Sequence, residues 1–178
     1  MNTKKIYALY LSGILNESQF HYALENTEQN SDINSIIKEY LNSEIGKKYQ
    51  EFDCKTVTRA FVNWAKEKGI HANVVLLAAP SIELVRENPK KYGGSSGEGD
   101  QHIMPVVNNH AIDFTIRQFG LPNTYFQPVI TPINNLESVY SKFGYFTNTF
   151  HEGGESSYIG PLEGANLGNF PDERLPNA

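Results

Sequence analysis

Cys54 is the single cysteine of the chain, and its type and position make it the first candidate for chemistry. Asp53 precedes it and is a favourable helix N-cap residue, so we expect Cys54 in the first turn of a helix. The unpaired N–H groups and the dipole at a helix start stabilise negative charge and thereby favour a nucleophilic thiolate. The position therefore predicts a thiol that can attack a carbonyl carbon.

A base for this thiol must come from elsewhere, and His102 is the best placed of the five histidines. It begins a predicted strand that ends at Asn108-Asn109, and Asp113 lies on the strand that follows. Asparagine tolerates a positive φ, so this pair suits a two-residue hairpin turn. With that turn, His102 and Asp113 are diagonal neighbours on one face, roughly 5–8 Å apart at Cβ. Asp113 could then orient the imidazole and stabilise its protonated form.

Each of these residues also has an interpretation without catalysis. A lone cysteine on an apolar helix face is usually a packing residue, and Cys54 could be one. Asp113 could cap a turn or pair with Arg117. His102, His110 and Asp113 could hold a metal ion, although His110 lies at the far end of the hairpin, so the three do not converge easily.

The elements that would position these residues are indicated by hydrophobic spacing. An apolar stripe indicates a helix that begins at Cys54, and Gly69 is a natural C-cap for that helix. A buried strand, 71–79, comes after it, and two further strands, 102–107 and 111–116, form the predicted hairpin. The apolar stripe consists of Val57, Ala60, Phe61, Trp64 and Ala65.

The remaining chain adds helices before this region and short elements after it. The first 50 residues read as helical, and we expect a helix over 136–143 and a strand over 145–150. The glycine-rich stretch 93–99 could be a lid over the site or only a linker. Residues 152–178 are rich in Gly, Ser, Asn and Pro, which predicts an irregular and partly disordered tail.

We therefore expect an α+β fold in one domain, residues 1–151. Its helical N-terminal part and the helix that carries Cys54 would pack on a small antiparallel sheet. Hydrophobic residues make up 39% of the 178 residues, which is enough for such a core.

Charge and cysteine content exclude several classes of function. The formal net charge of −5 does not favour nucleic acid or an anionic membrane surface, because both bind basic faces. A single cysteine cannot form an internal disulfide and is too few for a zinc site built mainly on thiolates.

The apolar run 6–15 is faintly like a signal peptide, but no small-x-small cleavage site follows it. An amphipathic helix in a cytoplasmic protein is the simpler interpretation.

Three segments together resemble a known superfamily. Residues 53–61 (DCKTVTRAF) are similar to the nucleophile helix of papain-like and transglutaminase-like cysteine enzymes. Residues 102–107 (HIMPVV) and 111–115 (AIDFT) resemble the strands that carry their histidine and aspartate. The phrase IDFTIRQF, residues 112–119, also resembles one found in papain-fold bacterial toxins and effectors. The resemblance covers roughly residues 50–120.

This resemblance implies a papain-like or transglutaminase-like core and a cysteine-dependent acyl hydrolase or acyl transferase: a peptidase, a protein deamidase or a related amidase. Cys54 would be the nucleophile, His102 the base and Asp113 its orienting acid. The backbone N–H of Cys54 would bind the oxyanion, with Gln50 and Asp53 as further oxyanion or substrate-binding candidates.

The implied substrate is a protein or peptide, cut at a peptide bond or at a glutamine side chain, and the chemistry needs no cofactor and no metal. The protein would be cytoplasmic, or an effector delivered without a classical signal peptide. The alternative is a non-enzymatic interaction or assembly protein on the same fold, with Cys54 buried and inert. The sequence does not indicate the oligomeric state.

Overall fold

The computed structural model describes residues 8–14, 16–17, 32–79, 101–119, 125–147 and 157–165. The chain divides into two compact units, Met1–Asn42 and Ser43–Ala178. In the first unit, residues 32–42 are helical, as the sequence predicted for this part of the chain. The second unit contains Cys54, His102 and Asp113. The glycine-rich stretch 93–99 lies outside the described residues.

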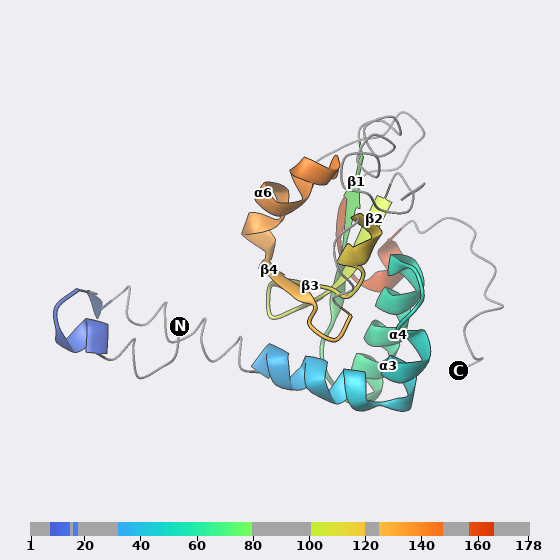
Figure 1. Cartoon of the computed structure of the whole chain (residues 1–178), viewed down its shortest axis with the longest axis horizontal. Helices are drawn as coiled ribbons and strands as arrows, with labels where there is room; N and C mark the ends of the chain where they lie inside the picture. Colours follow the sequence, from blue (N-terminus) through green and yellow to red (C-terminus); the bar gives the residue numbers. More distant parts are fainter. Residues whose placement is uncertain are drawn as a thin grey trace. The chain divides into compact units, whose positions relative to one another are not determined.

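Within the described residues of the second unit, five strands form one antiparallel sheet in the order β4-β3-β2-β1-β5 (Figure 1). With the helices beside it, this sheet makes the fold α+β, as the sequence predicted. The strands are β1 (Asn73–Ala78), β2 (Gln101–Val107), β3 (His110–Asp113), β4 (Val129–Pro132) and β5 (Tyr158–Gly160).

The β2–β3 hairpin has the predicted two-residue turn. Asn108 and Asn109 have φ values of 49° and 59°, and two consecutive positive φ values are typical of a type I′ turn. The pairs beside the turn are Val107↔His110 and Val106↔Ala111. This register puts His102 and Asp113 on one face, as the sequence predicted.

The strand after this turn is shorter than expected, since β3 ends at Asp113 and not at Ile116. The side chain of Asp113 causes this, because its Oδ1 accepts the backbone N–H of Thr115 over 2.8 Å. Such a bond between an aspartate and the second residue after it builds a local turn in place of a strand ladder. The chain then enters a 3₁₀ turn, η1 (Ile116–Phe119).

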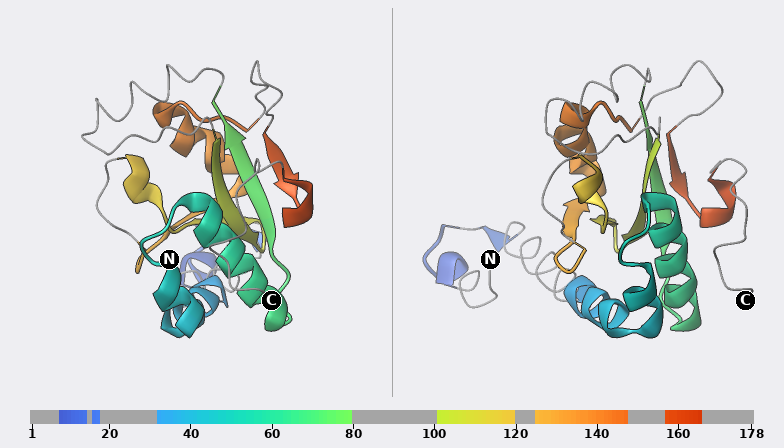
Figure 2. Two further views of the ribbon diagram at one scale, coloured as in Figure 1. Left: turned by 90° about the vertical axis from the view of Figure 1, so that its right-hand side faces the viewer. Right: turned by 45° about the vertical axis from the view of Figure 1, so that its right-hand side comes forward.

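Helices cover both faces of the sheet (Figure 2). On one face, α4 (Cys54–Glu67) packs against β2, and its Cys54 and Val62 share an apolar cluster with Leu76 and Ile103. On the other face, α6 (Leu136–Tyr140) contributes to a larger cluster with Val75, Leu77 and Met104. Neighbouring residues of β1 and β2 therefore point to opposite layers, as strand geometry requires.

The N-terminus of α4 is fixed where the sequence predicted it. Asp53 is the N-cap residue, and its Oδ1 accepts the backbone N–H of Thr56 over 2.9 Å. At the other end Gly69 has a φ of 71°, and the N–H of Ile70 bonds back to the carbonyl of Ala65, which closes the helix.

Several short elements complete the second unit. A short helix, α3 (Glu44–Tyr49), precedes α4. Three-residue 3₁₀ turns lie on either side of α6 and after β5: η2 (Ile133–Asn135), η3 (Ser141–Phe143) and η4 (Leu162–Gly164).

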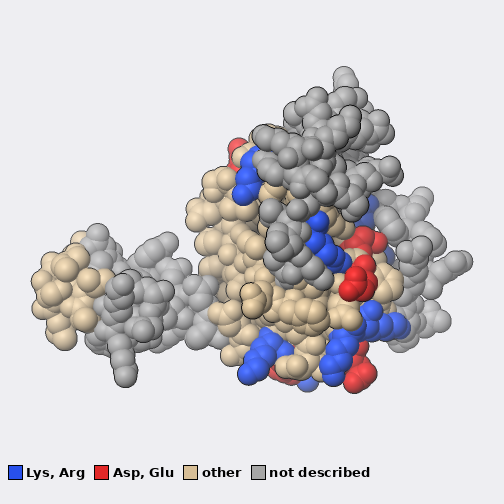
Figure 3. Space-filling model, viewed as in Figure 1, with Lys and Arg blue, Asp and Glu red and all other residues tan. Residues whose placement is uncertain are grey.

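In the space-filling view, acidic and basic side chains are interspersed and not separated by sign over the described surface that faces the viewer (Figure 3).

Two predictions for the C-terminal part need correction. Residues 158–160 form β5 and pair with β1, whereas composition alone predicted irregular structure here. A 3₁₀ turn, η4, follows, and residues 152–156 and 166–178 of the predicted tail lie outside the described residues. The strand predicted over 145–150 is reduced, within its described residues, to one bridge between Phe146 and Ala78. The predicted helix over 136–143 is present as α6 and η3.

Among the described residues, no helix has the length and apolarity that crossing a membrane requires.

Candidate active site

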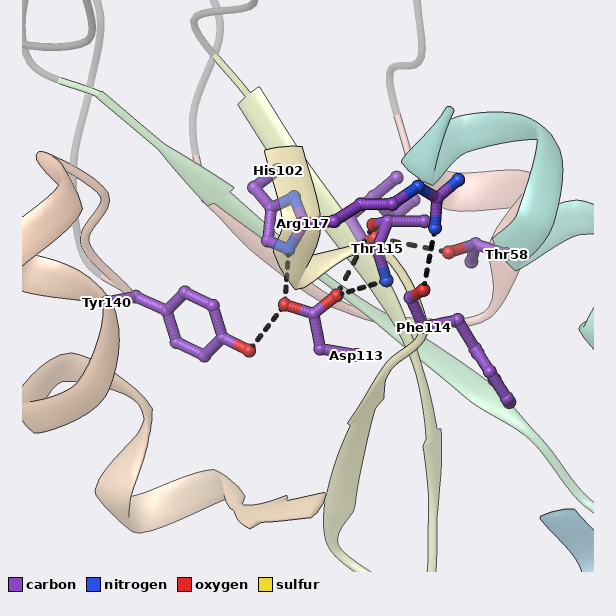
Figure 4. Close-up of polar contacts among 8 residues, drawn as sticks. Thr58, His102, Asp113, Phe114, Thr115, Arg117 and Tyr140 are labelled. Carbon is purple, nitrogen blue, oxygen red and sulfur yellow. Dashed lines mark hydrogen bonds and ion pairs between the residues drawn. The ribbon is translucent and has the colours of Figure 1, made fainter. Parts of the chain in front are cut away.

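His102 and Asp113 form a buried pair at the centre of the sheet. The Nε2 atom of His102 lies 3.0 Å from Oδ2 of Asp113 (Figure 4). His102 is 1% exposed and Asp113 is fully buried, so water does not screen their interaction. The diagonal arrangement that the hairpin register predicted thus becomes a direct hydrogen bond.

The Asp113 carboxylate has further partners on both oxygens. Oδ1 accepts the backbone N–H of Thr115 over 2.8 Å and the Thr115 hydroxyl over 3.3 Å. Oδ2 accepts the hydroxyl of Tyr140, from α6, over 2.8 Å (Figure 4). A buried carboxylate is costly unless such donors surround it, and here they come from three elements.

The electrostatics of the pair favour its charged form. Burial lowers the pKa of His102, but the charge and hydrogen bond of Asp113 outweigh burial, and the net effect raises that pKa to about 10. Burial in turn raises the pKa of Asp113, while the charge and hydrogen bond of His102, the Tyr140 hydroxyl and the Thr115 amide lower it overall. His102 is therefore an imidazolium, and Asp113 a carboxylate, at neutral pH.

Cys54 is a neighbour of this pair. It acts on His102 through a side-chain hydrogen bond and through its charge, and both raise the pKa of His102. The Thr58 hydroxyl, one turn further along α4, donates to the carbonyl of Ile103 over 3.1 Å and so ties the helix to the residue after His102. Since Asp113 occupies Nε2, the nitrogen left for the thiol is Nδ1. Cys54 is a free thiol and 8% exposed.

Aromatic rings surround the imidazole of His102. The rings of Phe119, Tyr140 and Tyr145 have centroids 4.8, 5.6 and 5.9 Å from its own. These rings keep water from the His102–Asp113 bond, and a low local dielectric strengthens that bond.

Arg117 fixes the approach of α4 to this site. Its guanidinium donates to the carbonyl of Phe52, just before α4, over 2.8 Å and to that of Phe114 over 3.1 Å. The segment after β3 is thereby held to the segment that leads to Cys54. Arg117 therefore bonds to backbone carbonyls and does not form the alternative pair with Asp113 that the sequence allowed.

The two further predicted site residues, Asp53 and Gln50, precede Cys54 closely in the chain. Asp53 is a helix cap, with Oδ1 on the amide and Oδ2 on the hydroxyl of Thr56, and an ionised carboxylate has no proton to donate to an oxyanion. Gln50 is half-buried at the C-terminal end of α3. Within the described part of the chain, no hydrogen bond joins Gln50 to Cys54 or His102.

The alternative metal site is not assembled. His110 bonds through Nδ1 to the carbonyl of Asn108 over 2.8 Å, at the turn, while His102 bonds to Asp113. No group of three or more His, Cys, Asp or Glu side chains suited to a metal ion occurs among the described residues.

Sequence reasoning did not identify Tyr140 and Thr115. Thr115 carried a signal, because a threonine two residues after an aspartate can close a local turn on it. Tyr140 carried none, since it lies 27 residues from Asp113 in a short helix without a distinctive motif.

Comparisons of the chain with protein-family models, with curated proteins and with solved structures find no significant match.

Proposed function

We propose that this protein is a cysteine-dependent acyl hydrolase or acyl transferase with a papain-like or transglutaminase-like core. One observation carries the proposal: an imidazole bonded to a buried carboxylate lies next to the only thiol, which stands at the start of a helix. The start of one helix and the two strands of one hairpin thus bring together a thiol, an imidazole and a carboxylate, the side chains that a cysteine nucleophile, its base and an orienting acid require. The packing of α4 on an antiparallel sheet supports the papain-like core.

The chemistry would start from an ion pair, in which Nδ1 of the His102 imidazolium already holds the proton given up by Cys54 and the sulfur is a thiolate. The sulfur attacks the substrate carbonyl carbon, and the carbonyl oxygen becomes an oxyanion that the backbone N–H of Cys54, in the first turn of α4, can bind. When the C–N bond breaks, His102 returns the proton to the leaving amine, and a thioester remains on Cys54. Attack by water on the thioester releases an acid and restores the thiol, which is hydrolysis; attack by an amine gives transfer.

The substrate class that fits this chemistry is an amide of a protein or peptide. A peptide bond would make the protein a peptidase, and a glutamine side chain would make it a deamidase or a transferase. All three reactions use the same three side chains, since only the leaving group and the attacking nucleophile differ.

An active ester tests the proposal without knowledge of the natural substrate. We expect p-nitrophenyl acetate to acetylate Cys54, with release of p-nitrophenolate and a protein mass increased by one acetyl group. Cys54→Ala should abolish both signals, and His102→Gln should reduce the acylation rate by about 100-fold or more, the size of a general-base contribution. Glutamine is chosen because it keeps a donor for the buried carboxylate of Asp113.

The matched control is His71→Gln, since His71 is an exposed histidine that precedes β1, away from the site. This variant should acylate at the rate of the wild-type protein. Equal rates for His102→Gln and His71→Gln would rule out His102 as the base.

A second candidate function is an interaction or assembly protein in which Cys54 is inert. It is favoured by the burial of Cys54, which is 8% exposed and belongs to an apolar cluster with Val62 and Ile103. Alkylation by iodoacetamide at about pH 6, well below the pKa of an ordinary thiol, separates the two candidates. A Cys54 that reacts no faster than a free cysteine model would favour the inert thiol.

A further inference from the structure

We propose that Tyr140 of α6 is a positioning residue of this site, because its hydroxyl holds the Asp113 carboxylate in the orientation in which Asp113 holds His102. The inference rests on the proposed function and adds a side chain from the opposite layer to it. The Tyr140 hydroxyl donates to Oδ2 of Asp113 over 2.8 Å, and Nε2 of His102 lies 3.0 Å from the same oxygen. Figure 4 shows Tyr140 and His102 reaching this oxygen from different elements.

The two ends of the carboxylate are fixed separately. Thr115 holds Oδ1 through its backbone N–H and its hydroxyl, over 2.8 and 3.3 Å. These bonds alone leave the carboxylate free to tilt about Oδ1. The Tyr140 hydroxyl removes that freedom, because it fixes Oδ2, the oxygen that orients the imidazole. Rotation of the imidazole away from Cys54 then requires a bond to break.

Tyr140 is suited to act as a permanent donor. Its ring is fully buried and packs beside the stacked rings of Phe119 and Phe143, with centroids 6.3 Å from each. Burial raises the pKa of its phenol, and the adjacent Asp113 charge raises it further, so the hydroxyl keeps its proton throughout the working range of pH. The aromatic packing sets the ring position, so that loss of the hydroxyl need not move the ring.

Among the residues that the structure describes, four titratable groups face His102 from the elements packed around it. They are Cys54 from α4, Asp113 from β3, Tyr140 from α6 and Tyr145, whose ring lies 5.9 Å away. Tyr145→Phe is therefore a matched control for Tyr140→Phe: each removes one hydroxyl oxygen from a buried ring beside the same imidazole, but only Tyr140 bonds to Asp113 within the described contacts.

The first test is the acylation of Cys54 by p-nitrophenyl acetate. We expect Tyr140→Phe to lower the maximal acylation rate about fivefold to tenfold, the weight of one typical hydrogen bond, with the half-saturating ester concentration unchanged. Tyr145→Phe, which keeps the ring beside the imidazole, should lower the rate less than Tyr140→Phe does. In an Asp113→Asn background, Tyr140→Phe should cause a smaller loss, because the two substitutions act on one interaction.

The second test does not depend on activity. In histidine-labelled protein, the proton on Nε2 of His102 should exchange with water faster in Tyr140→Phe than in Tyr145→Phe or the wild type, as followed by NMR. Equal exchange in the two tyrosine variants, or equal acylation rates, would overturn the positioning role. A faster exchange in Tyr140→Phe, with no acylation of the wild-type protein, would instead reject the proposed function and keep the role of Tyr140 in holding the pair.

Discussion

The buried His102–Asp113 pair makes the stability of the fold depend on pH. The pKa of His102 is about 10 in the folded protein and near 6.5 in an unfolded chain, so the folded state holds the proton more tightly. Its stabilising contribution is complete below pH 6.5 and is lost as the pH rises through about 10. We expect the free energy of unfolding to fall across this window, by at most about 1.4 kcal/mol per pH unit. Urea unfolding at a series of pH values measures it.

Asp113→Asn is the reference for this experiment. The pKa of Asp113 is lowered below 3.8, so its contribution is present above pH 3.8 and is lost as the pH falls through the folded value. The stability difference between the wild type and Asp113→Asn should therefore be largest between pH 3.8 and 6.5 and shrink on both sides. A difference that stays constant from pH 5 to pH 9 would contradict a charged pair.

At the scale of the element, α4 must begin at Cys54 for the site to exist, and Asp53 sets that start. Both oxygens of Asp53 bind Thr56, on its amide and on its hydroxyl. We expect Asp53→Ala to lower the free energy of unfolding by about 1 kcal/mol, while Asp53→Asn costs little because asparagine caps helices equally well. Urea unfolding of the two variants at neutral pH checks this prediction.

The same pair of variants separates helix capping from substrate binding. An Asp53 that only caps α4 predicts that Asp53→Asn acylates Cys54 at the wild-type rate. A carboxylate that contacts the substrate predicts a slower Asp53→Asn enzyme of unchanged stability. We expect the first result, because the contacts of Asp53 are inside the helix turn.

At the scale of the whole molecule, the sequence predicted the parts of the site that depend on local structure, which are the hairpin and the start of α4. It did not predict Tyr140, which is far from Asp113 in the sequence. The two asparagines accept a positive φ, which fixes the turn and hence the residues that share a face of β2 and β3. An N-cap and an apolar stripe were enough to place α4. β4 and β5 have only four and three residues, too few for alternation to be recognisable. Tyr140 meets Asp113 only because the sheet brings α6 beside it.

Within α4, the residues that hold the fold together differ from the residue that would do chemistry, and a pair of substitutions can separate the two roles. Trp64 is 3% exposed and packs against Phe61, with ring centroids 5.8 Å apart, on the face of α4 that holds the fold together. Trp64→Ala should lower the free energy of unfolding by roughly 3–5 kcal/mol, a large share of the 5–15 kcal/mol typical of a domain. Cys54→Ala removes one sulfur atom at the end of the same helix and should cost far less while it abolishes acylation.

Thermal unfolding followed by circular dichroism, with the acylation assay on the same samples, compares the two substitutions. Trp64→Phe is the control for Trp64→Ala, since it keeps an aromatic ring in the core and should recover most of the stability. If Cys54→Ala melted as early as Trp64→Ala, Cys54 would be a packing residue of α4. The proximity of the thiol to His102 would then follow from close packing of the two layers, and catalysis would not be needed to explain it.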